Sequence, residues 1–213
     1  MSEVLGEFLL GIFQNKYIAT LFVSMFPLIE LKGAIPIGTG LFGLSLFETS
    51  IISYLGSSII SVAVFFLLIP IFNLLKKLGF VRKIIEKIES IFNEKAQKIA
   101  DKTNGSATAE AKRIMMLSLF IFVAVPFPVT GVWTGTAIAV FLGLKFRESV
   151  LPIAGGNLIT GIIITLLTWL FKAYVDVIIY VLFAIAIVML IVFIAKIFLA
   201  KPKAKETGVS DEK

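Results

Sequence analysis

Residues 27–38 read PLIELKGAIPIG and residues 126–135 read PFPVTGVWTG, and each motif interrupts a stretch that is otherwise apolar. The apolar stretches run over residues 17–44 and 114–144. The arm on either side of a motif has about 10–12 residues, which as a helix covers roughly 15–18 Å, or half of the hydrocarbon core of a bilayer. We therefore expect two re-entrant helical hairpins, 17–44 and 114–144, each entering and leaving the membrane on one side.

Three other apolar stretches are long enough to cross a bilayer as single helices, which takes about 20 residues. They are residues 49–72, 151–171 and 175–199. Of the 213 residues, 58% are hydrophobic and 16% are charged, and the mean hydropathy is +1.01. This composition is typical of an integral membrane protein. The sequence predicts an all-α integral membrane fold with a single membrane domain over residues 1–200 and a disordered basic tail over 201–213.

Lysine and arginine are concentrated in residues 73–113 and in the tail. If both motifs form hairpins, the chain crosses the bilayer three times and the two basic regions lie on the same side, as the positive-inside rule requires. Five full crossings would separate them. The charge distribution therefore favours hairpins in a plasma membrane protein, with the N-terminus outside and the central loop and C-terminus cytoplasmic. Within 73–113, apolar residues at helical spacing predict an amphipathic helix on the membrane surface or, alternatively, packed on a partner chain or on the loop.

An internal repeat relates residues 43–59 to residues 143–159 at a constant offset of 100. The identical pairs are Gly43/Gly143, Leu44/Leu144, Glu48/Glu148, Gly56/Gly156 and Ile59/Ile159. Each repeat is then a hairpin followed by a full span, and the first span turns the second repeat upside down. We expect two inverted repeats followed by a third transmembrane helix, which is a recurrent plan of transporters.

Glu30 and Lys32 are the only charged residues in the middle of a segment predicted to lie in the membrane. Each would cost a few kcal/mol at the bilayer centre if it were unpaired. One interpretation is a structural ion pair, or a shallow tip that stays hydrated. The other is a functional site, in which Glu30 binds a proton or a cation and Lys32 contacts an anionic group.

Proline and glycine around these charges predict an unwound tip, so that both side chains can reach one cavity. Pro36 suits the first turn of the returning arm. The free N–H groups near Ile37 and Gly38 would then face the cavity and favour an anion there. Gly33 is included in this candidate site because it lies between the two prolines of the motif.

The second motif has no charge, but its residues offer hydroxyls, an indole N–H and close backbone approach. Its glycines can equally serve helix packing, and the tryptophan can equally be an interfacial anchor. Two residues outside the motif complete the candidate site: Arg113, which is more typical of a positive-inside anchor, and Asn157, which could form an interhelical hydrogen bond or line the cavity. The candidate residues of the motif are Pro126, Pro128, Thr130, Gly131, Trp133 and Thr134.

Cysteine and histidine are both absent from the sequence. Thiolate or histidine metal sites, thiol nucleophiles and Ser-His catalysis therefore have no residues to build them. We expect no enzymatic activity, no catalytic residue, no metal and no cofactor. Since the basic residues lie where a membrane protein marks its cytoplasmic face, the net charge of +6 does not indicate a nucleic-acid partner.

The runs ELKGAIP and PFPVTGVWTG resemble the small multi-drug export proteins, which are distantly similar to the DedA superfamily of membrane proteins. The likeness covers roughly residues 15–170. It implies two oppositely facing re-entrant hairpins and, for DedA-like relatives, movement of a lipid phosphate carrier driven by the proton-motive force. Family expectations for a membrane-embedded acid and a basic neighbour fall on Glu30 and Lys32. This chain departs from DedA-like proteins by having Thr130 and Gly131 where they typically have arginines, so the bidentate phosphate fork is missing.

These observations favour a small proton-coupled secondary transporter or exporter whose site lies at two opposed hairpin tips. Glu30 is the only candidate proton carrier at depth. One alternative is a translocase of an anionic lipid such as an isoprenoid phosphate, and another is a non-transporting membrane scaffold or stability factor. The expected partners are membrane lipids and a small-molecule or lipid substrate. Because three spans enclose little space, a homodimer is also expected.

Overall fold

A computed structural model of the protein describes residues 11–77, 109–127 and 129–174, with residues 82, 84–88, 90 and 94 and separate positions between 177 and 195. The expected third span is described only at those separate positions. Pro128, the tail 201–213 and much of the central loop lie outside the described residues. Within the described part of the chain every regular element is a helix.

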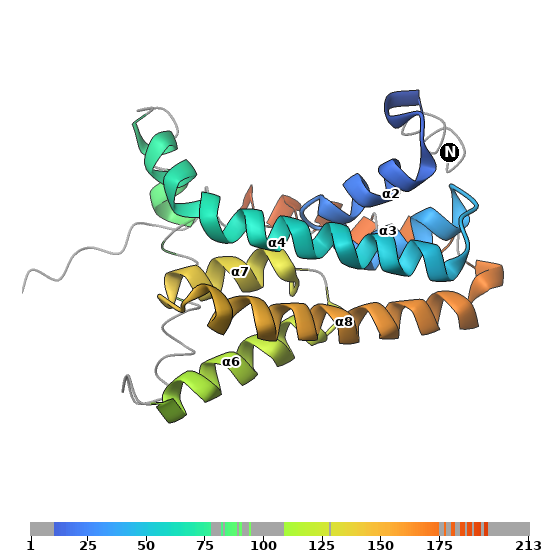
Figure 1. The fold of residues 1–213 in the computed structure, drawn as a ribbon. Helices are drawn as coiled ribbons and strands as arrows, with labels where there is room; N and C mark the ends of the chain where they lie inside the picture. Colours follow the sequence, from blue (N-terminus) through green and yellow to red (C-terminus); the bar gives the residue numbers. More distant parts are fainter. Residues whose placement is uncertain are drawn as a thin grey trace, which may run out of the picture.

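Two long helices, α4 (Leu46–Lys76) and α8 (Phe146–Leu170), run along the length of the molecule (Figure 1). Their apolar segments have 29 and 25 residues with mean hydropathies of 2.4 and 2.0. Both are therefore long and apolar enough to cross a membrane. The first two spans expected from the sequence fall almost wholly within these helices, although each helix begins a few residues earlier than expected.

The earlier start of α4 and α8 has a local cause, which is the same in both helices. The carboxylate of Glu48 accepts the N–H of Ser45 at 3.1 Å, and the carboxylate of Glu148 accepts the N–H of Lys145 at 2.9 Å. An acidic side chain that binds the free N–H groups of the first turn stabilises a helix start. The two glutamates therefore fix equivalent starts, 100 residues apart, for the two long helices.

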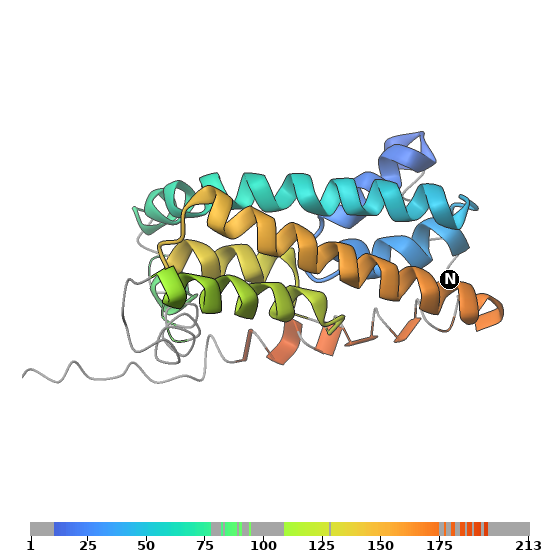
Figure 2. The same cartoon turned by 60° about the horizontal axis from the view of Figure 1, so that its bottom comes forward.

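Four shorter helices form two pairs, α2 (Lys16–Met25) with α3 (Glu30–Gly40) and α6 (Ala109–Ala124) with α7 (Val132–Phe141). Both views show that the first pair runs from one end of the molecule towards its middle and back, while the second pair does the same from the opposite end (Figure 2). The expected arms of 10–12 residues hold for three of these helices, whereas α6 is longer, with 16 residues. A short 3-10 helix, η1 (Lys172–Tyr174), follows α8.

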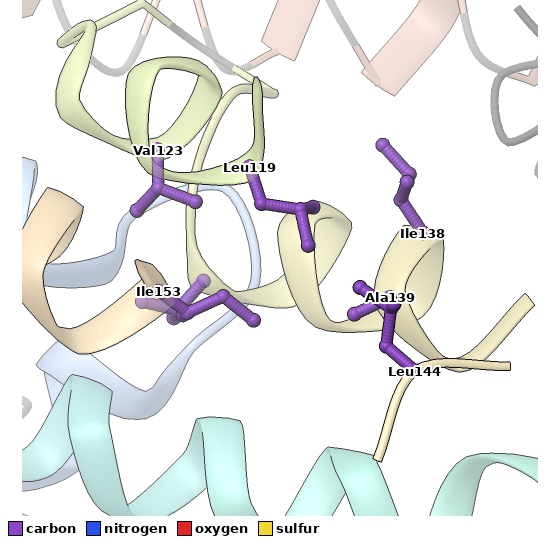
Figure 3. Packing of buried hydrophobic residues seen from close by; sticks show 7 residues of the cluster. Leu119, Val123, Ile138, Ala139, Leu144 and Ile153 are labelled. Atoms are coloured by element: carbon purple, nitrogen blue, oxygen red, sulfur yellow. The ribbon is translucent and has the colours of Figure 1, made fainter. Parts of the chain in front are cut away.

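Each pair of short helices is held together by its own apolar cluster. The first is built on residues of α2 and α3, and the second joins α6, α7 and α8 through Leu119, Val123, Ile138 and Ile153 (Figure 3). The side chains in these clusters are apolar, so their packing holds the helices of each pair together but orients no polar group. That orientation comes from hydrogen bonds at the breaks themselves.

Glycines bring the long helices close to the first arm of each pair. A Cβ at Gly56 of α4 would lie 2.6 Å from the carbonyl oxygen of Leu21 in α2, and a Cβ at Gly156 of α8 would lie 2.5 Å from the carbonyl oxygen of Phe120 in α6. Such contacts are possible only without a side chain, as is common between membrane helices. The two glycines of the sequence repeat therefore make equivalent helix contacts.

Candidate functional site

The first break lies at residues 26–29, between α2 and α3, and its backbone is strained. Leu28 and Glu30 have φ of 74° and 48°, values that side-chain-bearing residues rarely adopt. Such outliers persist only where the surrounding structure enforces them, and they gather at functional sites. Glu30 is thus the first residue of α3 and projects from the break.

The expectation that Pro36 begins the returning arm is wrong, because α3 already begins at Glu30 and contains Pro36 in its interior. A proline inside a helix removes one N–H donor, here the one that would bind the carbonyl of Lys32. The N–H groups near Gly38 therefore do not face a cavity. Gly38 instead packs closely, since a Cβ there would lie 2.6 Å from the Thr49 side chain.

The second break, between α6 and α7, is closed by the side chain of Thr130. Its hydroxyl lies within hydrogen-bonding distance of two carbonyl oxygens, that of Val125 at 2.7 Å and that of Phe127 at 2.9 Å. Val129 has a φ of 72°, which is a severe outlier for a β-branched residue. This strained loop leaves backbone carbonyls of the break directed towards the first hairpin.

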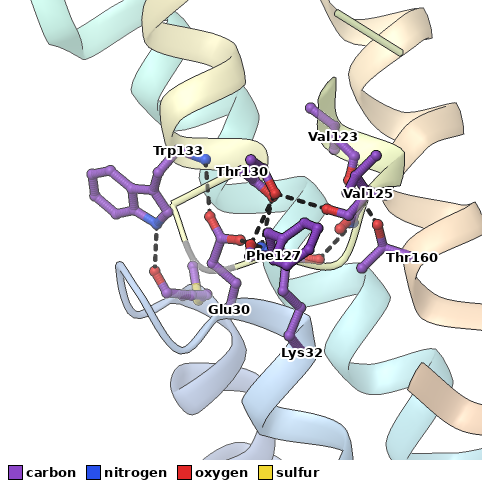
Figure 4. A network of polar contacts seen from close by, with 11 residues as sticks. Glu30, Lys32, Val123, Val125, Phe127, Thr130, Trp133 and Thr160 are labelled. Carbon is purple, nitrogen blue, oxygen red and sulfur yellow. Dashed lines mark hydrogen bonds and ion pairs between the residues drawn. The ribbon is translucent and has the colours of Figure 1, made fainter. Parts of the chain in front are cut away.

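The ammonium group of Lys32 joins the two breaks (Figure 4). Its Nζ donates to Glu30 Oε2 at 3.0 Å, to the carbonyl oxygen of Phe127 at 3.1 Å and to that of Thr130 at 2.7 Å. An ammonium has three N–H donors, and these three acceptors use all of them. Only 7% of the Lys32 surface and 6% of the Glu30 surface are exposed, so the pair is buried.

The carboxylate of Glu30 completes the connection from the other side. Its Oε1 accepts the backbone N–H of Trp133 at 3.2 Å, across 103 residues of sequence. Trp133 lies in the first turn of α7, where the unpaired N–H groups and the helix dipole favour a negative charge. A glutamate of the first hairpin therefore caps a helix of the second.

Gly131 and the Trp133 ring complete the contact between the tips. A Cβ at Gly131 would overlap the Glu30 carboxylate, so only glycine permits this approach. The indole N–H of Trp133 donates to the carbonyl oxygen of Met25 at 3.0 Å, at the end of α2. The structure thus brings together Glu30, Lys32, Thr130, Gly131 and Trp133, as expected from the sequence, while Pro126 lies in the break and the half-buried Thr134 follows on α7.

Three other candidate residues lie away from this network. Arg113 is exposed on α6, about 17 Å along the helix from the break. Asn157 donates from Nδ2 to Ser57 Oγ at 2.7 Å and so forms the interhelical hydrogen bond that was one of its two interpretations. Gly33 packs against its own turn, since a Cβ there would lie 2.6 Å from the Ile29 side chain.

Sequence reasoning missed the carbonyl oxygens of Met25, Phe127 and Thr130, because any residue can supply a backbone carbonyl. It also missed Ser57, although a signal for it exists. Small polar residues recur every four positions in α4, at Thr49, Ser53, Ser57 and Ser61, and all four are buried. This spacing places them on one helix face, and Ser61 lies 2.9 Å from the Thr136 hydroxyl of α7.

A groove of about 500 Å³ lies between α4 and α8. Its lining is uncharged and largely apolar, and Ser50 and Thr165 form a hydroxyl pair in it at 2.7 Å. Gly161 lines the groove and also contacts Leu31, because a Cβ at Gly161 would lie 3.2 Å from the Leu31 side chain. Through Gly161 the groove therefore borders on α3, the helix that carries Glu30 and Lys32.

The two breaks bury an ion pair, Glu30 with Lys32, inside an otherwise apolar molecule. Breaking a buried ion pair by removing one partner costs about 3–5 kcal/mol. Among the described residues, no cluster of carboxylates provides a ligand set for a metal ion. The groups that the two breaks bring together are the Glu30 carboxylate, the Lys32 ammonium and backbone carbonyl and N–H groups.

Comparison with known proteins gives a family for the chain. The family model described as "Putative small multi-drug export protein" matches residues 30–163, which is more than half of the chain; the match begins at Glu30, directly after the first break, and includes the second break. No curated protein and no solved structure matches. Because the match covers more than half of the chain, the chain belongs to the small multi-drug export family, whose name describes a transport role.

Proposed function

We propose that the protein is a small proton-coupled secondary transporter of the cell membrane whose site is the contact between the two helix breaks. The observation that carries this proposal is the buried Glu30–Lys32 pair, which bonds to the backbone of the opposite hairpin. Charged residues inside a membrane protein are expensive and mark pathways of ions or substrates. No part of this proposal requires catalysis.

The membrane arrangement that fits this function has each helix pair entering from its own side as a re-entrant hairpin. Broken helices that meet near the midplane, within two inverted repeats, are a common transporter plan. Three features separated by 100 residues support such a repeat: the matching helix starts at Glu48 and Glu148, the glycine contacts described above, and the hydrogen bond between Ser57 and Asn157. In the proposed topology the N-terminus lies outside, and the loop between α4 and α6 is cytoplasmic.

Glu30 is proposed as the proton carrier. As an ionised carboxylate it binds both Lys32 and the N–H of Trp133, and so holds the two tips together. A proton on Glu30 removes the charge that supports these bonds, which are roughly twice as strong as bonds between neutral groups. Proton uptake would therefore loosen one tip from the other, and the site could open to one side.

The groove between α4 and α8 supports access for an apolar substrate from the bilayer. Its volume of about 500 Å³ lies within the range of small-molecule sites, roughly 300–1,000 Å³. Gly161, which lines the groove, contacts the Leu31 side chain of α3, the helix that carries the charged pair. A transported molecule could therefore rest its apolar body in the groove while its polar group reaches the breaks.

Proteoliposomes loaded with a pH-sensitive dye test this function. Amphipathic cations, in turn a primary alkylammonium compound and the quaternary cation ethidium, are added outside, and proton movement is recorded. The unmodified protein should give proton movement that depends on the added compound, and Glu30→Gln should reduce the rate at least about tenfold because Gln cannot carry a proton. Glu86→Gln, at an exposed carboxylate outside the helix pairs, serves as the control and should match the unmodified protein.

The same experiment separates transport from a scaffold role. A scaffold gives no compound-dependent proton movement with either protein, and its cellular phenotype is unchanged by Glu30→Gln. Equal rates for Glu30→Gln and the unmodified protein would rule out Glu30 as the proton carrier.

A further inference from the structure

We propose that the oxygen atoms around the Lys32 ammonium form the binding site for a primary ammonium group of the transported substrate. The proposal rests on the proposed transport function and names its substrate class. We call these acceptors the ammonium cradle: Glu30 Oε2 and the carbonyl oxygens of Phe127 and Thr130. In this view Lys32 is a tethered cation that fills the cradle when no substrate is present.

The cradle is built for a cation from both hairpins. Glu30 belongs to the first helix pair, and the two carbonyls belong to the second break: Phe127 lies three residues after the end of α6 and Thr130 two residues before the start of α7. Near Phe127, the C-terminal end of α6 is the negative end of its dipole and favours a positive charge. Carbonyls of unwound segments, together with a carboxylate, are what broken-helix transporters use to hold cations.

The number of acceptors matches an ammonium such as that of Lys32, which occupies the cradle in the structure. The three contacts to Nζ measure 2.7–3.1 Å, which is the range of N–H···O hydrogen bonds. Magnesium and calcium bind oxygen at about 2.0–2.6 Å and require six or more ligands. The cradle has three acceptor atoms, and an alkylammonium has three N–H donors, so each donor can be bound.

An anionic substrate fits the same place less well. Besides Lys32 itself, one hydrogen-bond donor of the described residues, the backbone N–H of Trp133, contacts the Glu30 carboxylate. An anion would have to enter beside that carboxylate, where Gly131 already leaves no room for a Cβ. A cation instead replaces Lys32 without moving Glu30 from the start of α7.

Exchange of a proton for a substrate ammonium follows because both compete for the Glu30 carboxylate. An ammonium binds Glu30 only while the carboxylate is ionised, and a proton on Glu30 removes that charge. A proton and an ammonium therefore cannot be held at full strength together, so binding of one favours release of the other. Lys32 can leave the cradle because its ammonium sits on a flexible four-carbon stem.

Chemical rescue tests the cradle apart from transport. Lys32→Met removes the ammonium but keeps an unbranched side chain, and the purified variant is titrated with n-propylammonium at constant ionic strength. We expect a saturable rise in Tm of about 3 °C with n-propylammonium. Tetramethylammonium, which has no N–H donor, should give no such rise. The unmodified protein and the double variant Glu30→Gln/Lys32→Met, which lacks the carboxylate, should also show none.

The proposal is overturned if n-propylammonium and tetramethylammonium act alike on Lys32→Met, or if sodium gives the saturable rise instead. Should Lys32→Met fail to fold, proteoliposomes with the unmodified protein provide the second measurement. A fluorescent primary amine should be transported at least about tenfold faster than its N-acetyl derivative, and equal rates would refute the cradle. If the unmodified protein moves no compound while the rescue succeeds, the transport function fails and the ammonium site stands.

Discussion

Gly131 of one helix break lies directly against the Glu30 carboxylate of the other, so that a Cβ on Gly131 would overlap it. The contact joins residues from the two hairpins that are about 100 positions apart in sequence. It leaves the carboxylate bonded to Lys32 on one oxygen and to the N–H of Trp133 on the other. The size of a single side chain at position 131 therefore controls whether the two breaks can meet.

Gly131→Ala should separate the breaks. The added methyl group must displace the buried carboxylate, and overpacking of this kind costs typically about 1–3 kcal/mol. We expect a lower free energy of unfolding and strongly reduced transport. Gly11→Ala is the matched control, because a Cβ at Gly11 meets no atom within 4 Å. Equal stability of the two variants in denaturant unfolding would contradict the close contact.

The Glu30–Lys32 pair should show strong coupling in a double-mutant cycle. Glu30→Gln and Lys32→Met each leave a buried partner without its counter-charge, and we expect each to cost about 3–5 kcal/mol. The double variant should cost less than the sum, because it leaves no unpaired charge. Unfolding measurements on all four proteins give the coupling, and additive effects would disprove it. Arg82→Gln disrupts the exposed pair between Arg82 and Glu86 and should leave stability unchanged.

Trp133→Phe should weaken the contact between α7 and the end of α2. The substitution keeps an aromatic ring but removes the indole donor, which leaves the Met25 carbonyl without this hydrogen bond. A loss of about 1 kcal/mol in unfolding free energy is expected. Trp169→Phe changes the other tryptophan, which is 64% exposed, and should have a smaller effect. A larger effect at Trp169 would contradict the assignment.

The hydrogen bond between Asn157 and Ser57 should stabilise the packing of α4 on α8. Hydrogen bonds between membrane helices contribute about 0.6 kcal/mol on average and up to about 1.7 kcal/mol. Because the Asn157–Ser57 bond is buried and short at 2.7 Å, Asn157→Ala should fall near the upper value. Adding Ser57→Ala should then cost little more, since the bond is already absent. Additive losses in thermal unfolding would show that the two residues act separately.

Cysteine labelling tests the inverted arrangement of the repeats. The natural chain has no cysteine, so single substitutions report without background. Ser45 and Lys145 occupy equivalent positions before α4 and α8, and both are exposed. A membrane-impermeant thiol reagent should label Ser45→Cys from outside intact cells but reach Lys145→Cys only after permeabilisation. Labelling of both residues from the same side would rule out inverted repeats.

The sequence alone determined most of the helical plan. Proline and glycine cannot be continued as regular helix at low cost, and long apolar runs can only be helices in lipid. These two rules indicated an interruption in each of the two shorter apolar stretches and located the long helices α4 and α8, although the first break covers only residues 26–29. They also singled out Glu30 and Lys32, because a charge among apolar residues requires a partner wherever it lies.

Local rules placed some features wrongly. Pro36 was expected to start a helix, yet α3 begins six residues earlier, at Glu30, because the break covers only residues 26–29. A proline inside the helix is tolerated here because it removes the hydrogen-bond donor of only one carbonyl. Arg113 was included in the candidate site, yet it lies exposed on α6. Neither outcome can be read from residue type, since each depends on where the neighbouring helix begins.

Only the tertiary structure decided which groups form hydrogen bonds with Glu30 and Lys32. The partners of Lys32 include the carbonyls of Phe127 and Thr130, and the partner of Glu30 is a backbone N–H at Trp133. Every residue except proline carries both of these backbone groups, so the sequence does not indicate which carbonyl or N–H group will contact a charged side chain in the folded protein. Residue chemistry therefore determined that these charges needed partners, and the packing of two helix pairs from opposite ends determined which groups they met.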